Sequence, residues 1–171
     1  MKKGTIIILT LLAALLLTGC GGQKTEDSAP AGTQAAGGGK PAAANQPPLS
    51  LGEKVRSAVP DADTLLALGE EDLSDDLGIE AADCEEFVFL QSTGMDGREI
   101  LVIRAKTGEG TGKIAEAMEA HLKRRRDEAR NYAPEAYELL TAAEVKTAGR
   151  TVALIVGANA GRETETVLAG E

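Results

Sequence analysis

The sequence predicts an α+β domain in which helices pack against a mostly antiparallel sheet of about four strands. Two pairs of short apolar runs, each pair enclosing a turn-rich segment, predict two hairpins. Between the hairpins, a long segment with apolar residues at helical spacing predicts the main helix. The predicted domain covers residues 51–171, after a leader at residues 1–19 and a linker at residues 20–50.

The leader has the pattern of an export signal. Lys2 and Lys3 precede an uncharged apolar segment at residues 5–18, which is shorter than the roughly 20 residues of a membrane-spanning helix. The leader ends in the run Leu17-Thr18-Gly19-Cys20, which resembles the lipobox of bacterial lipoproteins. This resemblance implies cleavage after Gly19, a diacylglyceryl thioether on Cys20, and fatty acylation, such as with palmitate, of the new amino terminus. The alternative is an uncleaved membrane anchor with an incidental cysteine.

The segment between the leader and the domain predicts a flexible linker. Gly, Ala, Pro, Gln and Ser dominate residues 21–50, and no large apolar residue occurs before Leu49. Such a segment cannot bury enough surface to offset the entropy lost on ordering. A Gly-rich coil of ~30 residues has a mean end-to-end distance of about 30 Å.

The first predicted elements of the domain are two short helical segments. Ser50 and Glu53 have the spacing of a capping box, which predicts a helix through Ala58 that ends before Pro60. Gly78 is the expected terminator of the second segment. Leucines and one isoleucine are its expected apolar contacts: Leu65, Leu66, Leu68, Leu73, Leu77 and Ile79.

The two predicted hairpins have strands that do not alternate between apolar and polar residues. The first pairs residues 87–90 with residues 100–103, and the second pairs the strand at Val145 with residues 152–156 across Ala148-Gly149. Continuous apolar runs of this kind are typical of strands covered on both faces.

Three further helices are predicted. The long one runs from about Thr111 to Asn131, with Ile114, Met118, Leu122 and the aliphatic part of Arg125 on one face. Pro134 opens a second helix over residues 134–143, in which Leu139 and Leu140 dock against the core. Residues 160–168 predict a last short helix.

Composition argues against several classes of function. The formal net charge is −9, and the residues after Gly19 carry −11 because Lys2 and Lys3 lie in the leader. Such a chain lacks the basic surface that nucleic-acid binding requires.

Because Cys20 is assigned to the anchor, Cys84 has no internal disulfide partner. We expect Cys84 to be a small residue entering a strand, with a reactive thiol as the alternative.

Two motifs resemble binding sites without matching them. The run from Gly108 to Lys113 resembles a phosphate-binding loop, but only three residues separate its first Gly from the Gly-Lys pair, and Ile114 stands where a hydroxyl is needed. We predict a flexible strand-to-helix connection there.

Residues 53–86 hold twelve acidic and two basic residues, yet the spacing of the acidic residues differs from that in a calcium-binding loop. A solvated helix face is expected, and contact with the basic helix is the alternative.

The charged end of the long helix is predicted to be solvated, with an anion site as the alternative. Its basic residues lie at 123–126 and at Arg130, and Glu119 is spaced to pair with Lys123.

His121 is the only histidine, which argues against a zinc site and against a Ser-His-Asp catalytic triad. We expect a packed, satisfied histidine. Acidic residues are plentiful enough for a carboxylate-pair hydrolase, but no particular pair is indicated.

The domain from about residue 51 to residue 168 resembles DUF4358, a family of small bacterial lipoproteins defined by a domain of unknown function. The residues that carry the resemblance are the strand at 98–106, the helix end and following turn at 124–135, and the hairpin at 148–156. Residues 104–106 and Val152 depart slightly from the family pattern, and Leu77-Gly78 replaces its Tyr-Gly pair. The resemblance implies a lipoprotein found mostly in Gram-positive Firmicutes, and it brings no functional residues.

These observations predict a lipoprotein on the extracytoplasmic face of the cell membrane, bound to the membrane through the lipid on Cys20. We expect a non-enzymatic binding or accessory module whose partner is an envelope protein or a ligand. No cofactor, metal or nucleic acid is expected. The alternatives are an envelope hydrolase that uses carboxylates and a small ligand-binding lipoprotein.

Overall fold

A five-stranded antiparallel sheet forms the middle layer of residues 48–171, which are the residues that the computed structural model describes. The order of the strands across the sheet is β1-β2-β3-β5-β4. The strands are β1 (Leu66–Ala67), β2 (Cys84–Gln91), β3 (Glu99–Ala105), β4 (Val145–Ala148) and β5 (Thr151–Val156). The leader, Cys20 and residues 20–47 of the linker lie outside the described residues.

Both predicted hairpins are confirmed, and they pair with each other. β2 pairs with β3, β4 pairs with β5, and β3 pairs with β5 in a register that places Leu101 opposite Leu154. The two-residue strand β1 adds a fifth strand at one edge, where Leu66 lies opposite Gln91. The sheet therefore differs from the predicted one only by this short addition.

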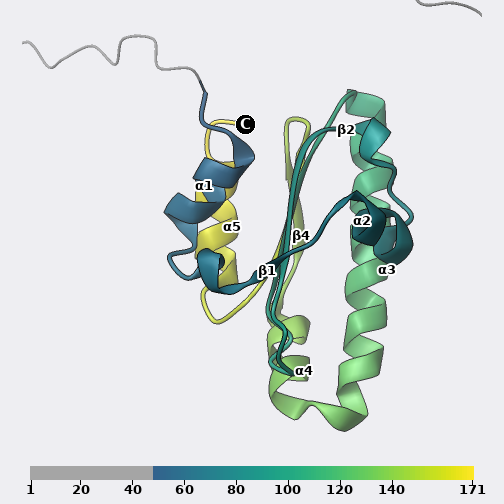
Figure 1. Ribbon diagram of the computed structural model, residues 1–171, viewed down its shortest axis with the longest axis vertical. Coiled ribbons are helices and arrows are strands. Elements are labelled where there is room, and N and C mark those ends of the chain that lie inside the picture. Colours follow the sequence, from purple (N-terminus) through teal and green to yellow (C-terminus); the bar gives the residue numbers. More distant parts are fainter. Residues whose placement is uncertain (1–47) are drawn as a thin grey trace, which may run out of the picture. The chain divides into compact units, whose positions relative to one another are not determined.

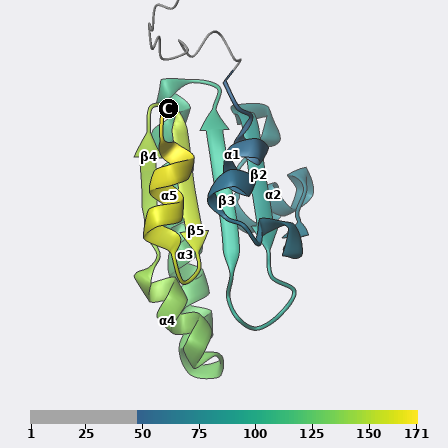
Figure 2. The ribbon, with the colours of Figure 1, turned by 90° about the vertical axis from the view of Figure 1, so that its left-hand side faces the viewer.

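Helices cover both faces of the sheet (Figures 1 and 2). One face carries α1 (Leu51–Ala58) and α5 (Ala160–Leu168). The other carries α2 (Glu70–Leu77), α3 (Gly108–Tyr132) and α4 (Pro134–Ala142). Two 3₁₀ turns, η1 (Ala62–Thr64) and η2 (Ala81–Asp83), connect these helices to the strands. No helix among residues 48–171 is both long and apolar enough to span a membrane.

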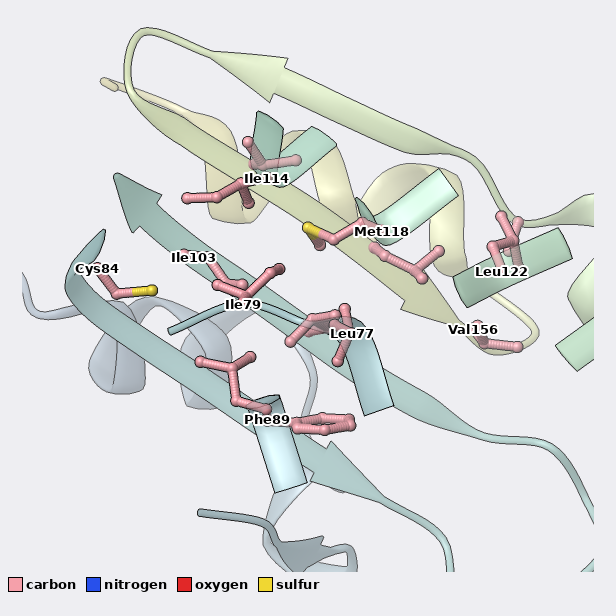
Figure 3. Close-up of a cluster of buried hydrophobic side chains, with 14 of the residues drawn as sticks. Leu77, Ile79, Cys84, Phe89, Ile103, Ile114, Met118, Leu122 and Val156 are labelled. Atoms are coloured by element: carbon pink, nitrogen blue, oxygen red, sulfur yellow. The ribbon is translucent and has the colours of Figure 1, made fainter. Parts of the chain in front are cut away.

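The central strands contribute to two aliphatic cores, one on each face. Along β5, Val152, Leu154 and Val156 belong to the core under α2, α3 and α4, whereas Ala153 and Ile155 belong to the core under α1 and α5. Figure 3 shows part of the first core, where Ile114, Met118 and Leu122 of α3 face the sheet. A strand buried on both faces needs no polar positions, which explains why its sequence is apolar without alternation.

The caps of the first two helices follow the predicted pattern. The Ser50 hydroxyl accepts a hydrogen bond from the Glu53 N–H at 3.2 Å, and the Glu53 carboxylate accepts one from the Ser50 N–H at 2.9 Å. Gly78 ends α2 with φ at 68°, in the left-handed region.

The prediction that Leu66 makes apolar contacts is wrong. Leu66 is 54% exposed, because it lies in the edge strand β1 with its side chain toward solvent.

The prediction of a flexible connection from Gly108 to Lys113 is also wrong, because this glycine-containing run forms the first turns of α3. The Thr107 side chain caps this helix by accepting a hydrogen bond from the Gly110 N–H at 3.1 Å. Thr111 and Ile114 are buried there. The cap and this burial oppose the helical penalty of glycine, which is about 1 kcal/mol per residue.

Candidate functional site

The predicted histidine lies in a buried polar network between α3 and β3. His121 is 2% exposed, and its Nε2 lies 2.7 Å from Oε1 of Glu99, which is 1% exposed. Arg124 donates to Nδ1 of His121 at 3.0 Å, so Nδ1 is an acceptor and Nε2 carries the proton that Glu99 accepts. Arg125 forms an ion pair with the other oxygen of Glu99. The expectation of a packed, satisfied histidine is confirmed.

The arginines at 124–126 of α3 bond to groups inside the domain. The prediction of a solvated helix end was wrong for Arg125 and Arg126, which are only partly exposed. Arg124 donates to the carbonyl of Asp76 at 2.7 Å, and Arg125 binds Glu99. Arg126 donates to the carbonyls of Leu140 and Ala143 at the end of α4, both at 2.7 Å. Sequence reasoning missed these roles because the partners come from other elements.

Lys123, Arg124 and Arg130 of α3 are exposed and match the solvated prediction, although Arg124 also bonds to Asp76 and His121. The side chains of Lys123 and Arg130 are 77% and 60% exposed, and both pair with Asp127. The expected pair between Glu119 and Lys123 is therefore replaced by the pair one turn later in the helix.

The acidic segment is divided between solvent and structural contacts. Glu70, Glu71 and Asp75 of α2 are exposed, as predicted for a solvated helix face. Its contact with α3 runs through the Asp76 carbonyl and Arg124, so α2 lies against the basic helix without using its carboxylates. Among residues 48–171, no group of three or more potential metal-ligating His, Cys, Asp or Glu residues occurs.

Cys84 begins β2 and is buried, as expected for a small residue entering a strand. Burial raises the pKa of the Cys84 thiol, and the charge of Asp83 raises it further, against an opposing effect of Lys106. A raised pKa disfavours the thiolate, which is the nucleophilic form of cysteine. This environment is that of a structural cysteine.

Glu171 is the centre of a polar cluster that ties α1 to the sheet. Its carboxylate accepts hydrogen bonds from Lys54 of α1, from Arg104 of β3 at 2.7 Å and from Thr151 of β5. Arg104 also pairs with Glu86 of β2 at 3.1 Å. Glu86 in turn accepts a hydrogen bond from the Leu51 N–H at 2.8 Å, which satisfies a free donor at the start of α1.

We expect the free energy of unfolding to fall in acid, because this cluster needs the ionised carboxylate of Glu171. Burial alone would raise the pKa of Glu171, but hydrogen bonds from Arg104, Lys54 and Thr151 outweigh it and lower the pKa from 4.5 to about 2. The stabilisation is complete above pH 4.5, and it is lost as the pH falls toward 2. Urea unfolding across this range should show Glu171→Gln less stable at neutral pH, with a difference from wild type that shrinks in acid.

An exposed glutamate provides the control for that experiment. The Glu165 side chain is 75% exposed, so Glu165→Gln should track the wild type at every pH. A constant difference between Glu171→Gln and wild type from neutral pH to pH 2.5 would show that the carboxylate charge is not the stabilising feature.

A pocket of about 530 Å³ lies where four separated parts of the chain meet. We call it the Asp61–Glu163 pocket. Its lining comes from the segment after α1, the start of β3, the end of α4, and the connection from β5 into α5. The lining residues are Pro60, Asp61, Arg98, Leu139, Gly157, Ala158, Asn159 and Glu163.

Glu163 reaches this pocket because of its place on α5. It precedes Val167 by one helical turn, and Val167 is completely buried in the core against the sheet. Residues four apart share a helix face, so the packing of Val167 turns Glu163 inward as well. Sequence reasoning did not single out Glu163, although a glutamate on the apolar face of a short helix is a usable signal.

The Glu163 carboxylate is buried and unpaired. The residue is 7% exposed, and no residue among 48–171 hydrogen-bonds or ion-pairs with its side chain. Every fully buried side-chain nitrogen and oxygen in this part of the chain has a hydrogen-bond partner, so the Glu163 oxygens keep some contact with solvent through the pocket. Its carboxylate is thus available to a ligand.

The charges around Glu163 favour its protonated form. Burial raises the pKa of Glu163 and the negative charge of Asp61 raises it further, while Arg98 and Arg162 act in the opposite direction. Asp61 is itself paired, because its Oδ1 lies 2.8 Å from Nη2 of Arg98. The pocket therefore combines one carboxylate that is paired with an arginine and one that forms no ion pair among residues 48–171.

The comparisons with known proteins identify the family. The family model of a domain of unknown function, DUF4358, matches residues 58–157, which is more than half of the chain. This match includes β1 to β5 and, among the residues that line the pocket, Asp61 and Arg98, while Glu163 lies beyond it. No curated protein and no solved structure matches the chain. The chain belongs to the DUF4358 family, which is defined by a domain of unknown function.

Proposed function

We propose that this protein is a bacterial lipoprotein held by lipid on Cys20 to the extracytoplasmic face of the cell membrane. Its domain would act there as a non-enzymatic binding module. The run Leu17-Thr18-Gly19-Cys20 and the charged, then apolar, leader before it support the anchor. A single acyl chain holds a protein only marginally, at about 0.8 kcal/mol per buried methylene, whereas two chains on one glycerol hold it stably.

The observation that carries the binding role is the unpaired Glu163 carboxylate in the Asp61–Glu163 pocket. Burying an ionisable group without a partner is unfavourable, and groups of this kind are concentrated at functional sites. The pocket volume of about 530 Å³ lies in the range of about 300–1,000 Å³ that is usual for small-molecule sites. These features support the narrower form of the proposal, a small ligand-binding lipoprotein.

Replacing Cys20 with serine tests the anchor. Because a hydroxyl cannot take the thioether-linked lipid, Cys20→Ser should leave the membrane fraction or keep its uncleaved leader, and its mass should lack the diacylglyceryl group. Fractionation and intact-mass measurement check both outcomes, with Cys84→Ser as the matched control that should remain lipidated. A Cys20→Ser protein that stays in the membrane at the mature wild-type mass would contradict the proposal.

A carboxylate-dependent hydrolase is the second candidate. It is favoured by the same pocket, because a glutamic acid with a raised pKa beside a second carboxyl group is an arrangement used for general acid–base catalysis. Analysis of the compounds recovered after incubation with the protein separates the two roles. A binding module returns every ligand unchanged, whereas hydrolysis that disappears in Glu163→Gln would favour the enzyme.

A further inference from the structure

We propose that the Asp61–Glu163 pocket binds a small organic amine, whose ammonium group lies against the Glu163 carboxylate. This inference rests on the binding role proposed above and adds the chemical class of the ligand. It is carried by the pocket, by the burial of Glu163 and by the absence of any ion pair to its carboxylate among residues 48–171.

The balance of charge in the pocket points to a cation. The residues that line it include two carboxylates, Asp61 and Glu163, and one guanidinium, that of Arg98. Arg98 already lies 2.8 Å from Asp61, so this pair neutralises itself. Among the lining residues, the remaining negative charge is that of Glu163, with which the neighbouring Arg162 forms no ion pair. A ligand ammonium would supply both a paired positive charge and hydrogen-bond donors to the Glu163 oxygens.

The other walls of the pocket favour an organic cation over a metal ion. Calcium requires about six to eight oxygen ligands, whereas this pocket offers only Asp61, Asn159 and Glu163 as oxygen-bearing side chains. The Arg98 guanidinium would also repel a divalent ion. Pro60, Leu139 and Ala158 instead present apolar surface suited to the carbon skeleton of an amine. An anionic ligand would have to approach the unpaired carboxylate.

Direct binding of simple probes tests this proposal. The full-length protein, purified from membranes in detergent, is titrated near neutral pH with n-butylamine and putrescine. The neutral probe n-butanol, the anion butyrate and calcium chloride are titrated in parallel. Affinities are measured by ligand-observed NMR. We expect the amines to bind, and Glu163→Gln, which keeps the shape of the side chain, to weaken them about tenfold or more, as expected when a charged hydrogen-bond partner is lost.

A variant on the same helix provides the matched control. Glu165→Gln removes the same charge two residues away, where the side chain is 75% exposed, and it should bind the amines as wild type does. Titration of the wild type in acid supplies a measurement that needs no variant. Amine affinity should fall as Glu163 becomes protonated, at a pH above its ordinary pKa of 4.5, under the opposing influences of Asp61, Arg98 and Arg162.

The outcomes separate this inference from the broader proposal. Equal binding of n-butanol and n-butylamine, or unchanged amine affinity in Glu163→Gln, would overturn the amine assignment. If binding of butyrate, n-butanol or calcium is the one that depends on Glu163, the ligand class is wrong and the pocket remains a binding site. If no probe depends on Glu163, the binding role proposed for the pocket is wrong as well.

Discussion

Replacing Glu99 with alanine is expected to lower the free energy of unfolding by about 3–5 kcal/mol, because it breaks a buried ion pair. Glu99 is 1% exposed and accepts hydrogen bonds from both His121 and Arg125. Its removal leaves the Arg125 guanidinium, which is 19% exposed, without its anion, and leaves the imidazole of His121 without an acceptor. Urea unfolding followed by circular dichroism measures this loss.

A glutamate on the exposed side of α3 is the control for this substitution. The Glu128 side chain is 64% exposed and lies 3.9 Å from Arg124, so Glu128→Ala should change the stability by no more than about 0.5 kcal/mol. If Glu99→Ala costs no more than Glu128→Ala, then the network between α3 and β3 does not stabilise the domain.

The second large effect is expected where the β2–β3 connection touches α4. Gly97 has φ at 73°, and a Cβ atom added there would lie 2.8 Å from the Cβ of Ala136 and 3.2 Å from its Cα. Left-handed backbone adds roughly 1–2 kcal/mol for a residue with a Cβ, and overpacking adds about 1–3 kcal/mol. We expect Gly97→Ala to lower the free energy of unfolding by about 2–5 kcal/mol in the same urea measurement.

Gly78 offers a matched control with the same backbone but no neighbour. Its φ is 68°, and a Cβ atom there would meet nothing within 4 Å. Gly78→Ala should therefore show only the conformational part, roughly 1–2 kcal/mol. Equal losses at Gly97 and Gly78 would mean that the loop can move away from α4 at no cost.

Local sequence signals predicted most of the elements of this fold. The capping box at Ser50, the terminator Gly78 and Pro134 at the start of α4 are all used as expected, because each acts on backbone groups close to it in the chain. The apolar runs of β3 and β5 also indicated burial on both faces. The prediction for the start of α3 is wrong because the Thr107 side chain caps a helix that the glycines alone do not favour.

The candidate site was not predictable in the same way. Asp61, Arg98 and Glu163 lie far apart in the sequence, and no spacing rule connects them. They meet because the sheet brings the start of β3 beside the end of β5. The partners of Arg125 and Arg126 likewise belong to β3 and to the end of α4, so two members of a basic run that looks solvated in sequence bond to the interior of the fold.

The attachment of α1 has a mechanical consequence. A force applied to the chain before residue 48 acts on the domain at the first turn of α1. There the Leu51 N–H donates a hydrogen bond to Glu86 of β2. One turn later, Lys54 is bonded to Glu171, which also holds β3 and β5. The force is therefore divided among β2, β3 and β5 before α1 can separate from the sheet. The fold therefore resists a force applied at the start of α1.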